Sequence, residues 1–161
     1  MADQYTKPYA DSNVYISTLK GPDAEDPAKV QTSVDILLLG ESGAFQIYAS
    51  TFIEAEVIKA PGESAPLTPD QERVITEYLD REFIVWVELD RLIAQKARQL
   101  SRAFGMKPAD AVHVATALRA GCDQFLTWDE KLHKDGLQVE SLYVCEPHTS
   151  GWQTSLLAAQ P

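Results

Sequence analysis

Short apolar runs alternate along the chain with longer segments in which apolar residues recur at helical spacing. The apolar runs that favour strands are "KPYA", "FQIYAS", "EFIVWVEL", "DQFLTW" and "LQVESLYVCEP". Helices are predicted between them, over residues 12–20, 26–42, 51–60, 70–80, 90–105 and 106–121. Strands that alternate with helices favour a mostly parallel sheet covered by helices on both faces.

The segment "MKPADAVHVATALRAG", residues 106–121, has clear helix signals and one unusual residue. Pro108 suits the first turn, where its missing N–H is no loss, and Gly121 suits the position just past the end. The apolar stripe of this helix consists of Val114, Ala117 and Leu118. Asp110 lies four residues before Val114 and therefore on the same stripe. A carboxylate on the inward face of an apolar helix requires an explanation.

Acidic residues also stand just past three of the predicted strands. Asp11 follows the first, Glu54 and Glu56 follow the second, and Asp129 follows "FLTW". Because sites in parallel sheets form at the carboxyl ends of strands, we expect these residues to approach Asp110. Bunched carboxylates repel by up to about 4 kcal/mol per pair at 4 Å in an effective dielectric near 20. This repulsion favours a bound cation, and hard oxygen ligands suit Mg²⁺ or Mn²⁺.

Each of these acidic residues also has an ordinary structural explanation. Asp11 can cap the helix that follows it, and Asp110 can interact favourably with its helix dipole. Asp129 can belong to a turn into a helix, and Glu56 can be a solvated helix residue. The convergence of four separate segments nevertheless favours a shared site. His113 lies one helical turn from Asp110, but a packed core histidine explains it as well as a catalytic one.

Length and composition indicate one folded domain and exclude several classes of protein. The chain has 161 residues, of which 45% are hydrophobic and 24% are charged. No apolar run approaches the roughly 18 residues that span a bilayer, and the N-terminus lacks a secretory signal pattern. Cys122 and Cys145 are too few for a disulfide framework, so we expect reduced thiols and a cytoplasmic location. The net charge of −10 argues against a general nucleic-acid coat protein.

Basic residues are nevertheless concentrated in one segment. Arg91, Arg98 and Arg102 are separated by seven and four residues and share one helix face, with Lys96 and Lys107 nearby. This face is either a solvated surface or a strip that contacts phosphates. The core stripe expected beside it comprises Leu92, Ala97 and Leu100.

Four motifs in the chain resemble those of the PIN-domain nucleases, in particular the VapC-like toxins of bacterial toxin–antitoxin pairs. They are "YADSNVYI", "STFIEAEVIKA", "MKPADAVHVATAL" and "DQFLTWDEKL". The resemblance extends over residues 8–147, so we expect a PIN-like nuclease domain over residues 1–147 and a tail over residues 148–161. It implies an α/β fold, a three-layer α/β/α sandwich with a mostly parallel five-stranded sheet. In the tail, Trp152, Leu156 and Leu157 are apolar enough to dock on a surface.

The resemblance also implies roles for individual residues. The four acidic residues expected to be catalytic and to bind metal are Asp11, Glu56, Asp110 and Asp129. Glu56 is preferred to Glu54 because the family pattern has Ser, five residues and then Glu before an aliphatic residue, as in Ser50 to Val57. Asn13 and Thr127 are expected to orient the carboxylates. Residues expected to contact RNA are Arg91, Arg98, Arg102 and Lys107.

The implied function is that of a metal-dependent endoribonuclease that cuts single-stranded RNA, with one or two Mg²⁺ or Mn²⁺ ions activating water. A cognate antitoxin and a homodimer are implied as well. In the run "VQTSVDILLLG", apolar residues surround much of the helix, which favours burial on both sides: Val34, Ile36, Leu37, Leu38 and Leu39.

Two other functions fit the sequence less well. The chain could be a catalytically weak PIN-fold module that binds RNA or a partner, although all four acidic residues are present. A haloacid-type hydrolase or phosphatase needs a second Asp two residues after the first, where this chain has Asn13.

Overall fold

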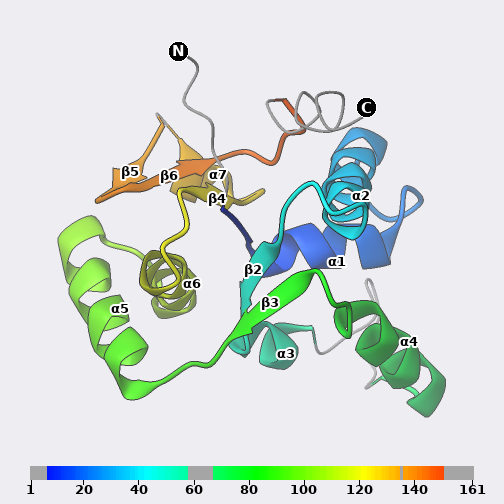
Figure 1. Cartoon of the computed structure of the whole chain (residues 1–161), viewed down its shortest axis with the longest axis horizontal. Coiled ribbons are helices and arrows are strands. Elements are labelled where there is room, and N and C mark those ends of the chain that lie inside the picture. The colour runs from blue at the N-terminus through cyan, green and yellow to red at the C-terminus, as the bar shows by residue number, and fades with distance from the viewer. Residues whose placement is uncertain (1–6, 58–66, 135, 151–161) are drawn as a thin grey trace.

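The computed structural model describes residues 7–57, 67–134 and 136–150, in which strands and helices alternate as predicted (Figure 1). The strands are β1 (Pro8–Ala10), β2 (Ile47–Ser50), β3 (Ile84–Val87), β4 (Gln124–Leu126), β5 (Gln138–Val139) and β6 (Leu142–Cys145). The helices are α1 (Ser12–Lys20), α2 (Pro27–Glu41), α3 (Phe52–Glu56), α4 (Pro69–Leu79), α5 (Arg91–Phe104), α6 (Pro108–Arg119) and α7 (Glu130–His133).

The strands form one sheet in the order β3-β2-β1-β4-β6-β5. All neighbours are parallel except β5 and β6, which are antiparallel. The mostly parallel sheet is confirmed, but it has six strands in place of the predicted five. The additional strand arises because the segment predicted as one last strand turns at Glu140, whose φ is 54°, and pairs Val139 with Leu142.

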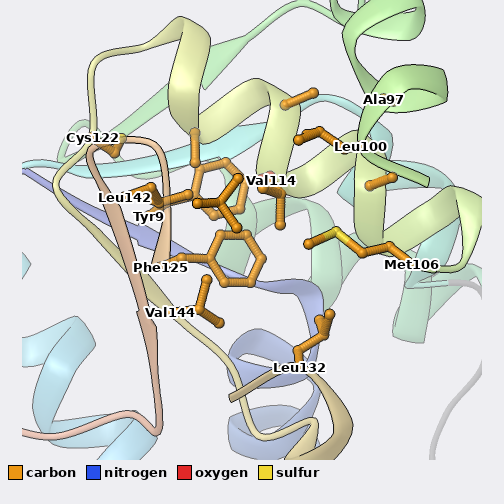
Figure 2. Close-up of a cluster of buried hydrophobic side chains, with 14 of the residues drawn as sticks. Tyr9, Ala97, Leu100, Met106, Val114, Cys122, Phe125, Leu132, Leu142 and Val144 are labelled. Atoms are coloured by element: carbon orange, nitrogen blue, oxygen red, sulfur yellow. The ribbon is translucent and has the colours of Figure 1, made fainter. Parts of the chain in front are cut away.

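Helices cover both faces of the sheet, with α5 and α6 on one side and α1, α2 and α4 on the other (Figure 1). Each side has its own apolar core. Successive strand residues serve opposite cores, since Tyr9 belongs to the α5–α6 side and Ala10 to the other. In the first core the rings of Tyr9 and Phe125 stack at 5.1 Å, with Val114 close by (Figure 2). The predicted three-layer α/β/α sandwich is thereby confirmed.

The core-facing stripe of α5 differs from the prediction at one position. Ile93, Ala97 and Leu100 are buried, whereas Leu92 is 55% exposed. Ile93, Ala97 and Leu100 follow i, i+4, i+7 spacing, and Leu92 is rotated from Ile93 by about 100°. In α6, Val114 and Ala117 are buried as predicted and Leu118 is partly buried.

The apolar helix α2 is buried over most of its circumference within the chain itself. Ile36, Leu37 and Leu39 lie in the core, Val34 is partly buried, and Leu38 is 53% exposed. The apolar surface of α2 that remains for a partner is therefore narrower than the five apolar residues of the sequence indicated.

The helix predicted over residues 51–60 is shorter in the structure, because α3 ends at Glu56 and the backbone of Val57 is not helical. Residues 58–60 of that prediction and the tail residues Trp152, Leu156 and Leu157 lie outside the described residues. The described helices include none that is long and apolar enough to cross a membrane. Cys122 and Cys145 are both free thiols.

Candidate functional site

The candidate site lies where the chain order of the sheet reverses. The chain passes from β1 through β2 to β3 on one side of β1, whereas β4 pairs with β1 on the other side. Ligands of open α/β sheets bind at such a switch point, beyond the carboxyl ends of the strands. Asp11 directly follows β1 and donates its backbone N–H to the carbonyl of Leu126 at 3.0 Å, and Thr127 to Asp129 follow β4.

Asp11 is 5% exposed, and both of its carboxylate oxygens are held. Oδ1 accepts the backbone N–H of Ser12 at 2.8 Å, so Asp11 does cap α1. Oδ2 accepts the hydroxyl of Thr127 at 2.7 Å and the amide Nδ2 of Asn13 at 3.1 Å. Burial raises the pKa of Asp11, while the nearby His113 and these hydrogen bonds oppose the rise. Asp11 therefore both caps α1 and contributes a carboxylate to the candidate site.

Asn13 and Thr127 join the ends of β1 and β4. Nδ2 of Asn13 donates to Oγ1 of Thr127 at 2.9 Å, and Oδ1 of Asn13 accepts the backbone N–H of Trp128 at 3.0 Å. Oγ1 of Thr127 also accepts the backbone N–H of Asp129 at 3.1 Å. The Thr127 hydroxyl thus makes one donated and two accepted hydrogen bonds, which is its full capacity. This network holds the Asp11 carboxylate in one orientation.

Asp110 lies partly buried in the first turn of α6, close enough to Asp11 and Asp129 for their charges to act on it. Burial raises its pKa, the charges of Asp11 and Asp129 raise it further, and Lys107 opposes the rise. Asp129 caps α7, with Oδ1 accepting the backbone N–H of Lys131 at 2.9 Å. The inward position of Asp110 therefore places it within an acidic cluster from three separate segments.

Glu56 reaches the cluster through His113. Oε2 of Glu56 lies 2.6 Å from Nε2 of His113, which in turn lies 3.8 Å from Oδ1 of Asp11. Glu54, by contrast, is exposed on α3. Burial lowers the pKa of His113, but the carboxylates of Glu56 and Asp11, with a contribution from Asp110, outweigh burial and raise it above the ordinary value.

The contacts of Tyr9 and His113 were not predicted from the sequence. Nδ1 of His113 lies 2.7 Å from the hydroxyl of Tyr9, and that hydroxyl accepts the backbone N–H of Ser50 at 3.0 Å. His113 is also a packed residue, with its ring 5.7 Å from that of Phe52. The sequence feature that could have identified His113 as a site residue is its position, three residues after Asp110 on the same helix face.

Among the predicted RNA-binding residues, Lys107 is linked to the acidic cluster by its effect on the pKa of Asp110. Arg91, Arg98 and Arg102 are exposed on α5, and in the described part of the chain they form no ion pair. Lys96 of the same helix pairs with Glu140.

The chemistry of the acidic cluster bears on which cation it could bind. Within residues 7–57, 67–134 and 136–150, no three His, Cys, Asp or Glu side chains are grouped as a ready metal site. The donors that converge are carboxylates, and after burial the charges of Asp11 and Asp129 contribute to the raised pKa of Asp110. Carboxylate oxygens are the ligands that hard divalent cations prefer.

Comparisons with known proteins agree with this architecture. A toxin–antitoxin complex from Klebsiella pneumoniae is similar over 84% of this chain and 94% of its own, with 16% identity and a TM-score of 0.59. VapBC2 from Rickettsia felis, bound to a DNA fragment from its promoter, is similar over 88% and 98%, with 12% identity and a TM-score of 0.61. FitAcB from Neisseria gonorrhoeae is similar over 76% and 88%, with 21% identity and a TM-score of 0.51.

These similarities establish the fold alone, because the sequence identities are too low to carry a function. No curated protein matches the chain by sequence. The model of the PIN domain family matches residues 9–135, a segment that runs from within β1 past β4 and includes every acidic residue of the cluster. The chain therefore belongs to the PIN domain family.

Proposed function

We propose that this protein is a divalent-metal-dependent endoribonuclease that cuts single-stranded RNA, and that it is the toxin of a toxin–antitoxin pair. PIN domains are generally nucleases, which makes a hydrolase acting on nucleic acid the expected class. The observation that carries the proposal is that Asp11, Asp110 and Asp129 come together from the ends of β1 and β4 and the first turn of α6, where burial and then the charges of the other two raise the pKa of Asp110. Such perturbed groups at a switch point are typical of functional sites.

The residues fit a hard cation by their chemistry. We assign Asp11, Glu56 and Asp110 as metal ligands and place Asp129 at a second ion or at a water. Carboxylate oxygens without cysteine suit Mg²⁺ or Mn²⁺. A cation would offset the repulsion by Asp11 and Asp129 that, after burial, raises the pKa of Asp110.

In this proposal the chain supplies orientation and charge. A bound divalent ion would lower the pKa of the attacking water and stabilise charge on the phosphate. Asn13 and Thr127 hold Asp11 in one orientation, so less reorganisation is needed when a cation binds. Lys107, beside Asp110, would contact a phosphate of RNA that crosses the site, with Arg91, Arg98 and Arg102 as further contacts.

Cleavage of a labelled single-stranded RNA tests the proposal. The purified protein should cut the RNA with Mg²⁺ or Mn²⁺, should not cut it in EDTA, and should leave single-stranded DNA of the same sequence intact. Asp11→Asn should abolish cleavage without preventing folding. Equal cleavage in EDTA, or full activity of the Asp11→Asn variant, would contradict the proposal.

An antitoxin and a second copy of the chain are the expected partners. Two of the structural neighbours are a toxin–antitoxin complex and VapBC2, which supports an antitoxin as partner. From the resemblance to toxin–antitoxin pairs we further propose that this antitoxin covers the acidic cluster and places an Arg or other side chain in it. For the homodimer we propose the face of α2 that presents Val34 and Leu38. We assign the nuclease domain to residues 1–147, with residues 148–161 as a tail, and expect the protein to act in the cytoplasm.

The second candidate is a catalytically weak PIN module that binds RNA or a partner protein. The hydrogen bonds that already hold the carboxylates of Asp11 and Glu56, from Thr127 and His113, favour it. RNA binding without metal-dependent cleavage in the same assay would support this alternative.

A further inference from the structure

A chain of hydrogen bonds runs from the backbone of β2 to the carboxylate of Glu56. The backbone N–H of Ser50 donates to the hydroxyl of Tyr9 at 3.0 Å. That hydroxyl lies 2.7 Å from Nδ1 of His113, and Nε2 of His113 lies 2.6 Å from Oε2 of Glu56. Tyr9 is 0% exposed and His113 is 1% exposed, so water does not compete for the two contacts of Tyr9, whereas the contact with Glu56 is only partly buried.

The direction of the hydrogen bonds follows from the donor at Ser50. The Tyr9 oxygen already accepts the Ser50 N–H, so its own O–H is left to be donated, and Nδ1 of His113 is the acceptor within reach. A neutral ring that accepts at Nδ1 carries its hydrogen on Nε2. A protonated ring carries a hydrogen on Nε2 as well. In either charge state, therefore, His113 presents an N–H to Glu56.

Glu56 needs such a donor because of its position. It is the last helical residue of α3, its side chain is 23% exposed, and the buried carboxylate of Asp11 lies near the same histidine nitrogen. A glutamate in this field would gain by turning toward water, since repulsion and side-chain entropy both favour the turned-out rotamers. The imidazole opposes this rotation from a rigid place, packed against the rings of Phe52 and Tyr9.

We propose that His113 is a positioning residue that holds Glu56 at the acidic cluster, and that Tyr9 fixes the ring tautomer for this task. The proposal rests on the proposed function, in which Glu56 helps to bind a divalent cation. His113 itself needs no contact with the cation or with RNA. It acts through Glu56, as the hydrogen-bonding partners of metal-binding side chains commonly do.

Variants at His113 and Tyr9 test this role, with Mn²⁺ binding by titration calorimetry and RNA cleavage as separate readouts. His113→Leu should weaken Mn²⁺ binding by about 10–100-fold and lower kcat by a similar factor, with little change in KM for RNA. His113→Gln keeps an N–H near the position of Nε2 and should restore most of the affinity. Tyr9→Phe frees the tautomer and should cause a smaller loss. Thr116→Val, a buried change on the same helix whose hydroxyl bonds only the carbonyl of Val112 among the described residues, is the matched control and should bind Mn²⁺ like wild type.

A double-mutant cycle with Glu56→Ala separates positioning from general damage to the fold. If His113 acts through Glu56, His113→Leu should have little further effect on Mn²⁺ affinity in the Glu56→Ala background. Additive losses would overturn the proposal. So would a folded His113→Leu variant with wild-type affinity, or a folded His113→Gln variant as impaired as His113→Leu.

If His113→Leu does not fold, Tyr9→Phe and His113→Gln decide the question. Wild-type affinity in Tyr9→Phe would then overturn the role of Tyr9, and a large loss in a folded His113→Gln would overturn the role of His113. Wild-type protein that neither binds Mn²⁺ nor cuts RNA would overturn the proposed function together with this inference. Wild-type protein that does both, while the His113 variants match it, would overturn this inference alone.

Discussion

The hydroxyl of Thr127 offers a sharp test of how the acidic cluster is held. Thr127→Val keeps the shape of the side chain and removes three hydrogen bonds, one that the hydroxyl donates and two that it accepts. The donated bond, to Oδ2 of Asp11 at 2.7 Å, has a carboxylate acceptor. The accepted bonds come from Nδ2 of Asn13 at 2.9 Å and from the backbone N–H of Asp129 at 3.1 Å. Thr127 is buried, so water does not replace what is lost.

The expected loss of stability follows from these three bonds. A hydrogen bond to a charged group contributes about 1.5–3 kcal/mol, and a buried donor left without a partner costs about 1–3 kcal/mol. Asn13 keeps its bond to Asp11, and Asp129 lies partly exposed, so the two accepted bonds contribute less than the full penalty. We therefore expect Thr127→Val to lower the free energy of unfolding by about 2–4 kcal/mol in metal-free protein.

Thr116→Val is the matched control for this substitution. Both threonines are 0% exposed, but the Thr116 hydroxyl donates to the carbonyl of Val112 within α6. That carbonyl also takes part in the backbone hydrogen bonding of the helix, so it keeps a partner when the hydroxyl is removed. Its removal should cost less than about 1 kcal/mol. Equilibrium denaturation in urea with EDTA present, at equal m-values, measures both.

Coupling to Asp11 identifies the cause of the loss. In an Asp11→Asn background, Thr127→Val should cost at least about 1 kcal/mol less than in wild type, because the charged acceptor is gone. If Thr127→Val costs no more than Thr116→Val, or if its cost is unchanged by Asp11→Asn, the reasoning about the Asp11 network is refuted.

Three further outcomes are expected. Because burial and the neighbouring carboxylates raise the pKa of Asp110, stability from its protonated form is complete in acid and is lost as pH rises through that pKa. Metal-free Asp110→Asn should therefore match or exceed the stability of wild type at neutral pH in thermal melts. Mn²⁺ at a hundred times its dissociation constant should stabilise wild type by about 2.7 kcal/mol and should stabilise the variant much less. A variant that is destabilised without metal and still responds fully to Mn²⁺ would exclude Asp110 as a ligand. Replacing Arg91, Arg98 and Arg102 with Ala should weaken binding to all RNA sequences alike and flatten its salt dependence, and an unchanged slope would make them a solvated face. Light scattering should show a dimer at tens of micromolar that Leu38→Asp dissociates, and a wild-type monomer would contradict the proposed interface.

Local features of the sequence were sufficient to predict most of the architecture. Helix boundaries followed from nearby residues, as at α6, where Pro108 occupies the first turn and Gly121, with φ of 71°, follows the end. The alternation of strands and helices predicted a parallel sheet, and the strand ends predicted where Asp11 and Asp129 would lie. These predictions succeeded because helical periodicity, capping and strand ends depend on residues within a few positions of one another.

Tertiary structure decided the features that depend on distant residues. It selected Ile93 over Leu92 for the core and divided the last predicted strand at Glu140. It also paired His113 with Glu56, 57 residues away, and with Tyr9, 104 residues away. No local pattern specifies such partners, because a histidine in an apolar helix has the same sequence context whether it packs in a core or donates to a carboxylate. Only the packing of α6 against the sheet brings His113 within 3 Å of Tyr9 on β1 and of Glu56 on α3.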